Sequence, residues 1–275
     1  MTEQALTEEA IRPWLRRKDQ PIICLDTVDS TNNYAKTRAA QGAPDGTAIT
    51  AECQTGGRGR LGRSFQSPKG KGLYLTVLYR PHLPPSEAVK LTAYTALAVC
   101  AGVQAATGVR PGIKWTNDIV LNGKKLCGIL TEMVTNSRGA LDYVIAGLGV
   151  NVSHRPEDFS PDVAAMATSL AQELDRPIDR ARLCGEILNA MERIRQAWLA
   201  GRGDILWARY QADCLTLGRH VRLLGQEEPR EAFAEDIDRD FGLRVRYPDG
   251  RQETVTAGEV SVRGLYGYVE SGPPA

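Results

Sequence analysis

The segment Gln54-Thr55-Gly56-Gly57-Arg58-Gly59-Arg60-Leu61-Gly62-Arg63 decides between two fold classes for this chain. Its run Gly57–Gly62 fits the spacing G-x-G-x-x-G of a dinucleotide-binding loop, which needs a helix directly after it to meet the pyrophosphate. Pro68 and two further glycines follow instead, and then an apolar run, residues 73–79, that is typical of a strand. We therefore reject a Rossmann fold and predict a loop that joins two strands, residues 47–53 and 73–79.

The composition of this segment predicts that it binds an anionic group. Three arginines and four glycines occupy its ten residues. Arginine presents a planar fork of donors suited to phosphate and carboxylate oxygens, and glycine lets a ligand approach the backbone closely. Two other interpretations stay open for these ten residues alone. They are a mobile, solvated basic hairpin tip and an Arg-Gly segment that contacts RNA.

The overall composition is that of a water-soluble, cytoplasmic protein. Lys and Arg total 34 against 33 Asp and Glu, and this balance argues against a general binder of nucleic acids or membrane surfaces. The sequence has no run of 18 apolar residues, and its acidic, polar beginning does not resemble a signal peptide. The six cysteines form no C-x-x-C pair and the three histidines are scattered, so we expect reduced thiols and no zinc site.

A second strong signal is a hairpin between residues 113 and 134. The dipeptide Asn122-Gly123 separates two apolar runs, 113–121 and 124–134, and favours a type I′ turn. The other expected elements are strands 21–25 and 141–152 and helices 31–40, 86–107, 161–174, 179–199 and 203–213. Because strands and helices do not alternate regularly, we predict an α+β fold with a mixed, largely antiparallel sheet and packed helices.

The turn also fixes which residues of the hairpin face one another. It predicts that Val120 lies opposite Lys125 and that Asp118 lies opposite Cys127. Opposed residues share a face of the sheet, as do alternate residues, so Asp118 and Lys125 should be diagonal neighbours. A carboxylate and an ammonium beside a basic loop suit a metal–phosphate site. A surface ion pair of little energetic value explains the same spacing equally well.

The last quarter of the chain has a different texture. Short alternating runs separated by turn residues begin at about Cys214, and they predict a small β-barrel of SH3-like type. We therefore expect two domains, residues 1–213 and 214–275. Within the larger one, Gly147 and Gly149 interrupt a predicted strand, which usually marks close approach by a ligand or a neighbouring chain segment.

Taken together and in this order, the motifs resemble those of biotin protein ligases, from about Pro21 to the end of the chain. The matching segments are Asp29-Ser30-Thr31-Asn32, Gln54, Gly57–Arg63, Lys114–Ile119, Lys125 with Gly128–Glu132, and Gly147–Asn151. The resemblance implies a class II synthetase-like catalytic domain followed by the SH3-like domain. Thr116 replaces a usual proline, and Phe65 stands where a tryptophan is common, so the residue that stacks on adenine stays open.

The resemblance also implies roles for particular residues. Lys125, Arg60 and Asp118 would be catalytic, and Asp118 would help to hold Mg²⁺. The biotin-binding residues would be Ser30, Thr31, Asn32, Gln54, Arg58, Gly59, Arg60, Lys125, Gly128, Gly147 and Gly149. The residues that bind ATP or the adenylate would be Arg58, Arg60, Arg63, Phe65, Lys114, Asn117 and Asn151.

The implied activity has two half-reactions. The substrates ATP and biotin form biotinyl-5′-AMP, and the biotinyl group then passes to a lysine of a biotin carboxyl carrier protein, such as that of acetyl-CoA carboxylase. The substrate carboxylate is the nucleophile, so no Ser, Cys or His triad is needed. Only about 20 residues precede the first strand, too few for a helix-turn-helix, so we expect no DNA binding.

Two alternative functions remain at this point. A lipoate-protein ligase would share the fold and the reaction, although the Arg-Gly loop and the SH3-like tail favour biotin. An RNA-binding module would use the Arg-Gly loop, but the near-neutral charge and the lack of aromatic residues among its arginines argue against it. The oligomeric state is undecided, since an edge strand of the sheet leaves a homodimer open.

Overall fold

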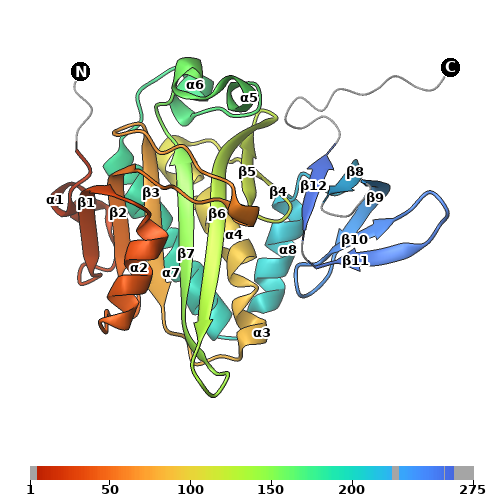
Figure 1. Ribbon diagram of the computed structural model, residues 1–275, viewed down its shortest axis with the longest axis horizontal. Helices are drawn as coiled ribbons and strands as arrows, with labels where there is room; N and C mark the ends of the chain where they lie inside the picture. The colour runs from red at the N-terminus through yellow and green to blue at the C-terminus, as the bar shows by residue number, and fades with distance from the viewer. Residues whose placement is uncertain (1–4, 225–228, 257, 263–275) are drawn as a thin grey trace.

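The computed structural model describes residues 5–224, 229–256 and 258–262, which form two β-sheets with helices packed around the larger one (Figure 1). Residues 263–275 of the expected second domain lie outside the described residues. The larger sheet contains β1 (Ile22–Val28), β2 (Ala48–Gln54), β3 (Gly72–Tyr79), β4 (Gly112–Lys114), β5 (Asp118–Leu121), β6 (Lys124–Thr135) and β7 (Leu141–Asn151). Their order is β1-β2-β3-β7-β6-β5-β4. Among the described strands of this sheet only β1 and β2 pair in parallel, so the predicted mixed, largely antiparallel sheet is confirmed.

The helices are α1 (Glu8–Ile11), α2 (Thr31–Ala40), α3 (Pro85–Ala88), α4 (Leu91–Thr107), α5 (Pro161–Ala164), α6 (Leu170–Leu174), α7 (Arg180–Leu199) and α8 (Gly203–Asp213). The described residues also contain three short 3₁₀ turns, η1 (Arg12–Trp14), η2 (Arg60–Gly62) and η3 (Pro156–Asp158). The single helices predicted over 86–107 and 161–174 are wrong, because each is divided into two. In the second case Ala167 forms a β-bridge with Lys125, which an uninterrupted helix would not allow.

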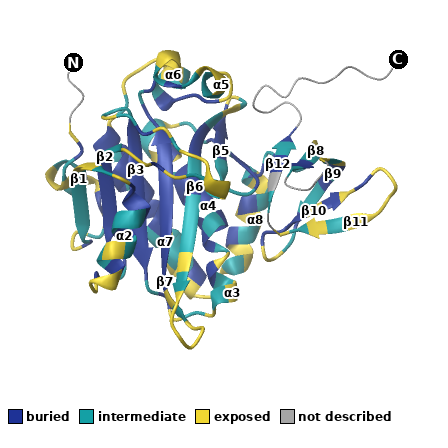
Figure 2. Ribbon diagram, in the orientation of Figure 1, coloured by how far each residue is buried: buried dark blue, intermediate teal, exposed yellow. Residues whose placement is uncertain are grey.

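Helices cover both faces of the large sheet. On one face α4 and α7 lie side by side behind the central strands (Figure 1). Leu75, Val77 and Ala146 belong to the same core cluster as the apolar residues of these two helices. On the other face α2 packs its Ala35 and Ala39 against a smaller apolar cluster. Strands β3 and β7 are almost wholly buried, as their dark blue ribbons in Figure 2 show. This two-sided burial explains why β3 is a continuous apolar run rather than an alternating one.

Helix α4 is the apolar centre of this arrangement. The stretch Pro85–Thr107 is long and apolar enough, by length and composition alone, to cross a membrane. However, 67% of its most apolar window is buried inside the molecule, as in the core helix of a soluble protein. Gly102 allows α7 to come close, because a Cβ at that position would lie 2.6 Å from the Cα of Ile187.

The predicted hairpin is present, but its register differs beyond the turn. Asn122 and Gly123 have φ values of 49° and 78°, as a type I′ turn requires, and Val120 pairs with Lys125 as predicted. Asp118 lies opposite Gly128 and not opposite Cys127, because the register shifts next to Val120 and leaves one extra residue in β6. A bulge of this kind changes the direction of the side chains beside it.

The second sheet is built from β8 (His220–Leu224), β9 (Arg230–Ile237), β10 (Leu243–Arg246), β11 (Gln252–Val255) and β12 (Glu259–Val262), in the order β11-β10-β9-β8-β12. The predicted small all-β unit is therefore confirmed, with β12 as a strand that the sequence did not reveal. It is hydrogen-bonded to the larger unit through Trp115, whose indole donates to the carbonyl of Phe241 at 2.8 Å. The amide of Leu215 donates to the carbonyl of Ile113, also at 2.8 Å.

Candidate active site

The Arg-Gly segment forms a loop that crosses in front of β7 and β6 (Figure 1). Its two arms are joined at Gln54 and Ser67 and again at Arg58 and Ser64. The amide of Phe65 also donates to the carbonyl of Gly57 at 2.8 Å. The loop leads into strand β3 rather than a helix, so the rejection of a dinucleotide-binding motif is confirmed.

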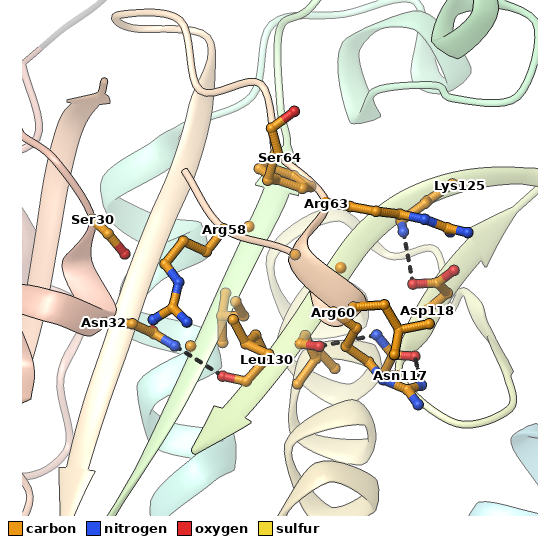
Figure 3. Close-up of a pocket in the computed structure, with 18 of the residues that line it drawn as sticks. Ser30, Asn32, Arg58, Arg60, Arg63, Ser64, Asn117, Asp118, Lys125 and Leu130 are labelled. Atoms are coloured by element: carbon orange, nitrogen blue, oxygen red, sulfur yellow. Dashed lines mark hydrogen bonds and ion pairs between the residues drawn. The ribbon is translucent and has the colours of Figure 1, made fainter. Parts of the chain in front are cut away.

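The loop and the sheet enclose a cavity that collects nearly all of the predicted site residues (Figure 3). The predicted residues that line it are Ser30, Thr31, Asn32, Gln54, Arg58, Gly59, Arg60, Arg63, Phe65, Lys114, Asn117, Asp118, Lys125, Gly128, Gly147 and Gly149. Asn151 is the exception, since it is buried and its amide donates to the carbonyl of Thr168 at 3.0 Å.

Several lining residues were not singled out from the sequence. They are Leu61, Ser64, Trp115, Ile129, Leu130, Leu148 and Val260. Most are immediate neighbours in sequence of predicted residues, and they belong to the same motifs. Val260 belongs to β12 and reaches the cavity only because the two sheets pack together, which no local signal in the sequence indicates.

One end of the cavity is lined by neutral hydrogen-bonding groups together with the guanidinium of Arg58. Ser30 occupies the N-cap position of α2, but its side chain makes no capping hydrogen bond. The amide and hydroxyl of Thr31 both donate to Oε1 of Gln54, at 2.8 and 3.0 Å. The Nε2 group of Gln54 in turn donates to Ser67 at 2.9 Å. These polar side chains are therefore held in fixed orientations where helix α2 begins.

Asn32 is held in place by two strands of the sheet. Its Oδ1 accepts from Thr76 at 2.7 Å, and its Nδ2 donates to the carbonyl of Leu130 at 3.1 Å (Figure 3). Gly147 makes this possible, because a Cβ there would lie 2.0 Å from the Oδ1 of Asn32. The close approach predicted for the two glycines of β7 is thus confirmed. At Gly149 the neighbour is the ring of Phe65, 2.5 Å from the position of a Cβ.

The other end of the cavity holds the predicted ion pair. Nζ of Lys125 lies 2.8 Å from Oδ1 of Asp118 (Figure 3). The backbone of Lys125 is fixed from the far side, since its amide donates to Met166 and its carbonyl accepts from Thr168. The side chain of Lys125 remains one-third exposed, at 34%, so it is accessible to a ligand.

Arg60 connects three parts of the chain at this end. Its Nη1 donates to the side chains of Thr116 and Asn117, at 2.9 and 2.7 Å, and its Nη2 donates to the carbonyl of Gly258 at 2.7 Å. The loop is thereby tied both to the start of β5 and to the start of β12. Asn117 is itself fixed, because its amide donates to the carbonyl of Ile129 at 3.0 Å.

The two ends differ sharply in charge. Four cationic side chains, those of Arg60, Arg63, Lys114 and Lys125, line the second end, and Asp118 is the only carboxylate among the described lining residues. No cysteine or histidine lines the cavity within the described residues. Such a site is suited to stabilising the negative charge of carboxylate and phosphate groups, with a nucleophile that the substrate brings.

Comparison with known proteins identifies the family to which this chain is similar. Residues 24–151 match the Biotin/lipoate A/B protein ligase family, and residues 216–263 match the Biotin protein ligase C terminal domain. The chain is 38% identical to the bifunctional ligase/repressor BirA of Bacillus spizizenii, over 79% of this chain and 67% of that protein. It is 36% identical to the biotin--[acetyl-CoA-carboxylase] ligase of Mycobacterium tuberculosis, over 84% of this chain and 85% of that protein.

A solved structure agrees with these relatives. The biotin protein ligase from Aquifex aeolicus, in complex with biotin and ATP, superposes with a TM-score of 0.75 at 27% identity, covering 89% of this chain and 99% of that one. The fold and the site thus define a ligase of the biotin/lipoate class. The chain belongs to the biotin protein ligase family, and it is a biotin ligase.

Proposed function

We propose that this enzyme condenses biotin with ATP to biotinyl-5′-AMP and then transfers the biotinyl group to a lysine of a biotin carboxyl carrier protein. The observation that carries the proposal is the polarity of the cavity. Neutral groups of Thr31, Asn32 and Gln54 suit the uncharged ureido ring of biotin. The cationic end around Lys125 suits its carboxylate and the phosphates of ATP. The relative from Aquifex aeolicus binds both ligands.

In the first half-reaction a carboxylate oxygen of biotin attacks the α-phosphorus of ATP, and the bond to the bridging oxygen breaks to release pyrophosphate. Lys125 would contact the carboxylate and the α-phosphate, where it offsets the charge that develops in the transition state. Arg60 and Arg63 would offset the polyphosphate charge and shield the adenylate from water. Arg58, for which the same role was expected, is paired with Glu132 at the other end of the cavity. The enzyme contributes position and electrostatic stabilisation, and no covalent intermediate with a side chain is required.

In the second half-reaction the amine of a carrier lysine attacks the carbonyl carbon of the mixed anhydride. An amide forms, AMP leaves, and the amine loses a proton. The carrier is proposed to be the biotin-accepting domain of acetyl-CoA carboxylase, because relatives from Mycobacterium tuberculosis and Paracoccus denitrificans are named as ligases for that enzyme.

The residues at the cationic end fit a Mg²⁺ ion that is held by one protein carboxylate together with substrate phosphates and waters. No group of three or more His, Cys, Asp or Glu side chains among the described residues is arranged to hold a metal ion without help. Mg²⁺ commonly uses one carboxylate together with substrate phosphates and waters, and Asp118 supplies such a carboxylate. When bound, the ion would neutralise phosphate charge, while Asp118 also keeps the ammonium of Lys125 in place.

We also propose a domain boundary between residues 213 and 214, with catalytic residues 1–213 and an SH3-like domain over 214–275. Helix α8 ends at Asp213, and the match to the C-terminal family domain begins at residue 216. The second domain would complete the active site, because Val260 lines the cavity and Gly258 accepts a hydrogen bond from Arg60.

Pyrophosphate release from Mg-ATP tests the function, with biotin or lipoate as the only added acid. Release that depends on biotin, followed by labelling of a carrier domain, is the expected result. Release with lipoate alone would contradict the substrate and keep the chemistry. No release with either acid would contradict the ligase reaction and would favour the RNA-binding alternative. A salt-dependent gel shift on unrelated RNA would then test that alternative.

A further inference from the structure

Glu132 stands beside the neutral end of the cavity without lining it. It lies on β6, seven residues after Lys125, and its side chain is 20% exposed. Its carboxylate accepts hydrogen bonds from donors on two other segments. Nζ of Lys36 lies at 2.5 Å and Nδ2 of Asn32 at 2.9 Å, both on α2. The guanidinium of Arg58, on the Arg-Gly loop, lies at 3.1 and 3.3 Å.

The cationic Arg58 therefore occupies the end of the cavity that has otherwise neutral groups. Figure 3 shows its guanidinium beside Asn32, apart from the pair of Lys125 and Asp118. A second carboxylate is close by, because Nη1 of Arg58 donates to Asn33 at 3.1 Å and Asn33 donates to Asp29 at 2.7 Å. The cluster thus contains two cations, Lys36 and Arg58, and two carboxylates, Glu132 and Asp29.

The titration of the two carboxylates agrees with this charge balance. Burial alone would raise the pKa of Glu132, but the hydrogen bonds from Lys36 and Asn32 and the charges of Lys36 and Arg58 hold it below its usual value. The hydrogen bond from Asn33, together with the charge of Arg58, likewise holds the pKa of Asp29 below its usual value. Both carboxylates are therefore ionised at neutral pH, and the cluster has no net charge.

We infer that Glu132 is the residue that gives the enzyme its preference for a substrate with one charged end and one neutral end. This inference rests on the proposed function. An uncompensated Arg58 would attract a carboxylate or phosphate to the ureido end, since arginine forms strong paired hydrogen bonds with such groups. Glu132 occupies Nη1 of Arg58 and cancels its charge. The carboxylate of the substrate is then directed to the other end, where cations outnumber Asp118.

The test compares biotin with octanedioate, a dicarboxylate of similar length that has a charge at both ends. Calorimetric dissociation constants are measured for each acid without ATP, so that no turnover occurs. In the parent enzyme biotin should bind far more tightly than octanedioate. In Glu132→Gln, which keeps the size of the side chain, the ratio of the two constants should shift toward octanedioate by about tenfold, equivalent to about 1.4 kcal/mol.

A double variant separates charge from scaffolding. Glu132→Gln combined with Lys36→Gln removes one carboxylate and one cation, so the cluster is neutral again, and the ratio should return to within about threefold of the parent value. If Glu132 mattered only as a scaffold for Asn32, the double variant would stay as altered as the single one. That outcome, or an unchanged ratio in Glu132→Gln, would overturn the inference.

Two controls complete the design. Asp142→Asn removes a carboxylate that pairs with Arg80 at 3.4 Å and does not line the cavity, and it should leave the ratio unchanged. Asp29→Asn should shift the ratio in the same direction as Glu132→Gln, which keeps the inference testable if the latter protein does not fold. Failure of the parent enzyme to bind biotin would instead contradict the proposed function.

Discussion

Asp118 and Lys125 form an ion pair at 2.8 Å although neither lies opposite the other in the hairpin. Asp118 pairs with Gly128, and Lys125 pairs with Val120. The diagonal contact predicted from the turn is therefore kept, even though β6 has one extra residue in this stretch. A Cβ at Gly128 would lie 3.6 Å from Nζ of Lys125, which is ordinary van der Waals contact. The position of the ammonium is therefore set by the strand itself and not by a flexible loop.

Replacement of this lysine should slow adenylate formation. Lys125→Ala removes the ammonium expected beside the reacting carboxylate and the α-phosphate. If it acts like an oxyanion donor, the loss is on the order of 3–4 kcal/mol, a rate lower by roughly 10²–10³. The rate of adenylate formation is measured as biotin-dependent pyrophosphate release in a single turnover. Lys124→Ala, an exposed neighbour in the same hairpin, is the matched control and should be nearly inert. An adenylation rate in Lys125→Ala equal to the parent's would refute the role.

Arg60 should matter most for retention of the intermediate. Arg60→Gly removes the three hydrogen bonds that tie the loop to Thr116, Asn117 and Gly258. A loop without these contacts should open more often, so free biotinyl-5′-AMP should leave the enzyme about tenfold faster, which corresponds to about 1.4 kcal/mol. Chromatography of the released adenylate measures this.

A matched control for the loop is Arg138→Gly, in the exposed turn between β6 and β7. It removes an arginine of the same charge and should leave adenylate release unchanged. Equal release rates for Arg60→Gly and the parent enzyme would show that the loop is closed by other contacts.

The hairpin shows how far sequence reasoning reaches. The turn at Asn122-Gly123 depends only on local backbone preferences, and it was predicted correctly. The partner of Asp118 was predicted one residue away from its true position, Gly128. The extra residue, Leu126, is completely buried in the core, so the bulge depends on packing against distant elements. Hydrophobic pattern alone gives no signal for it.

In the active site, too, local motifs could be predicted from the sequence, whereas long-range contacts could not. Residues in contiguous motifs, such as Ser30 to Asn32, were found because their order and spacing are preserved in the sequence. The contact between Arg60 and Gly258 was not found, since 198 positions separate the two residues. The bridge from Lys125 to Ala167, which divides a predicted helix, was missed for the same reason.

A side chain at Gly147, where glycine leaves room for Asn32, should weaken the binding of biotin. In Gly147→Ala the new methyl group would overlap Oδ1 of Asn32, which must then give up its hydrogen bond from Thr76. We expect the KM for biotin to rise by roughly tenfold or more, since a buried polar group without its partner costs about 1–3 kcal/mol. The KM for ATP should change little. Gly203→Ala is the control, because its nearest neighbour would lie 3.7 Å away. Equal increases in both KM values would indicate a general distortion of the sheet.

His154 should make the protein less stable in mild acid. The side chain is completely buried and stacks on Phe159, with ring centroids 5.0 Å apart. Burial lowers the pKa of His154 to about 4. In the unfolded chain it would titrate near 6.5, so the unfolded state binds the extra proton between about pH 6.5 and 4. The free energy of unfolding should therefore fall by about 3 kcal/mol across this window because of His154.

Urea unfolding at several pH values measures how steeply the free energy of unfolding falls with pH. This pH dependence should be weaker in His154→Leu, whereas His82→Asn, at an exposed position, should leave it unchanged. The comparison with the parent removes the contribution of carboxylates such as Asp158, and equal slopes in parent and His154→Leu would show that the buried imidazole is not responsible.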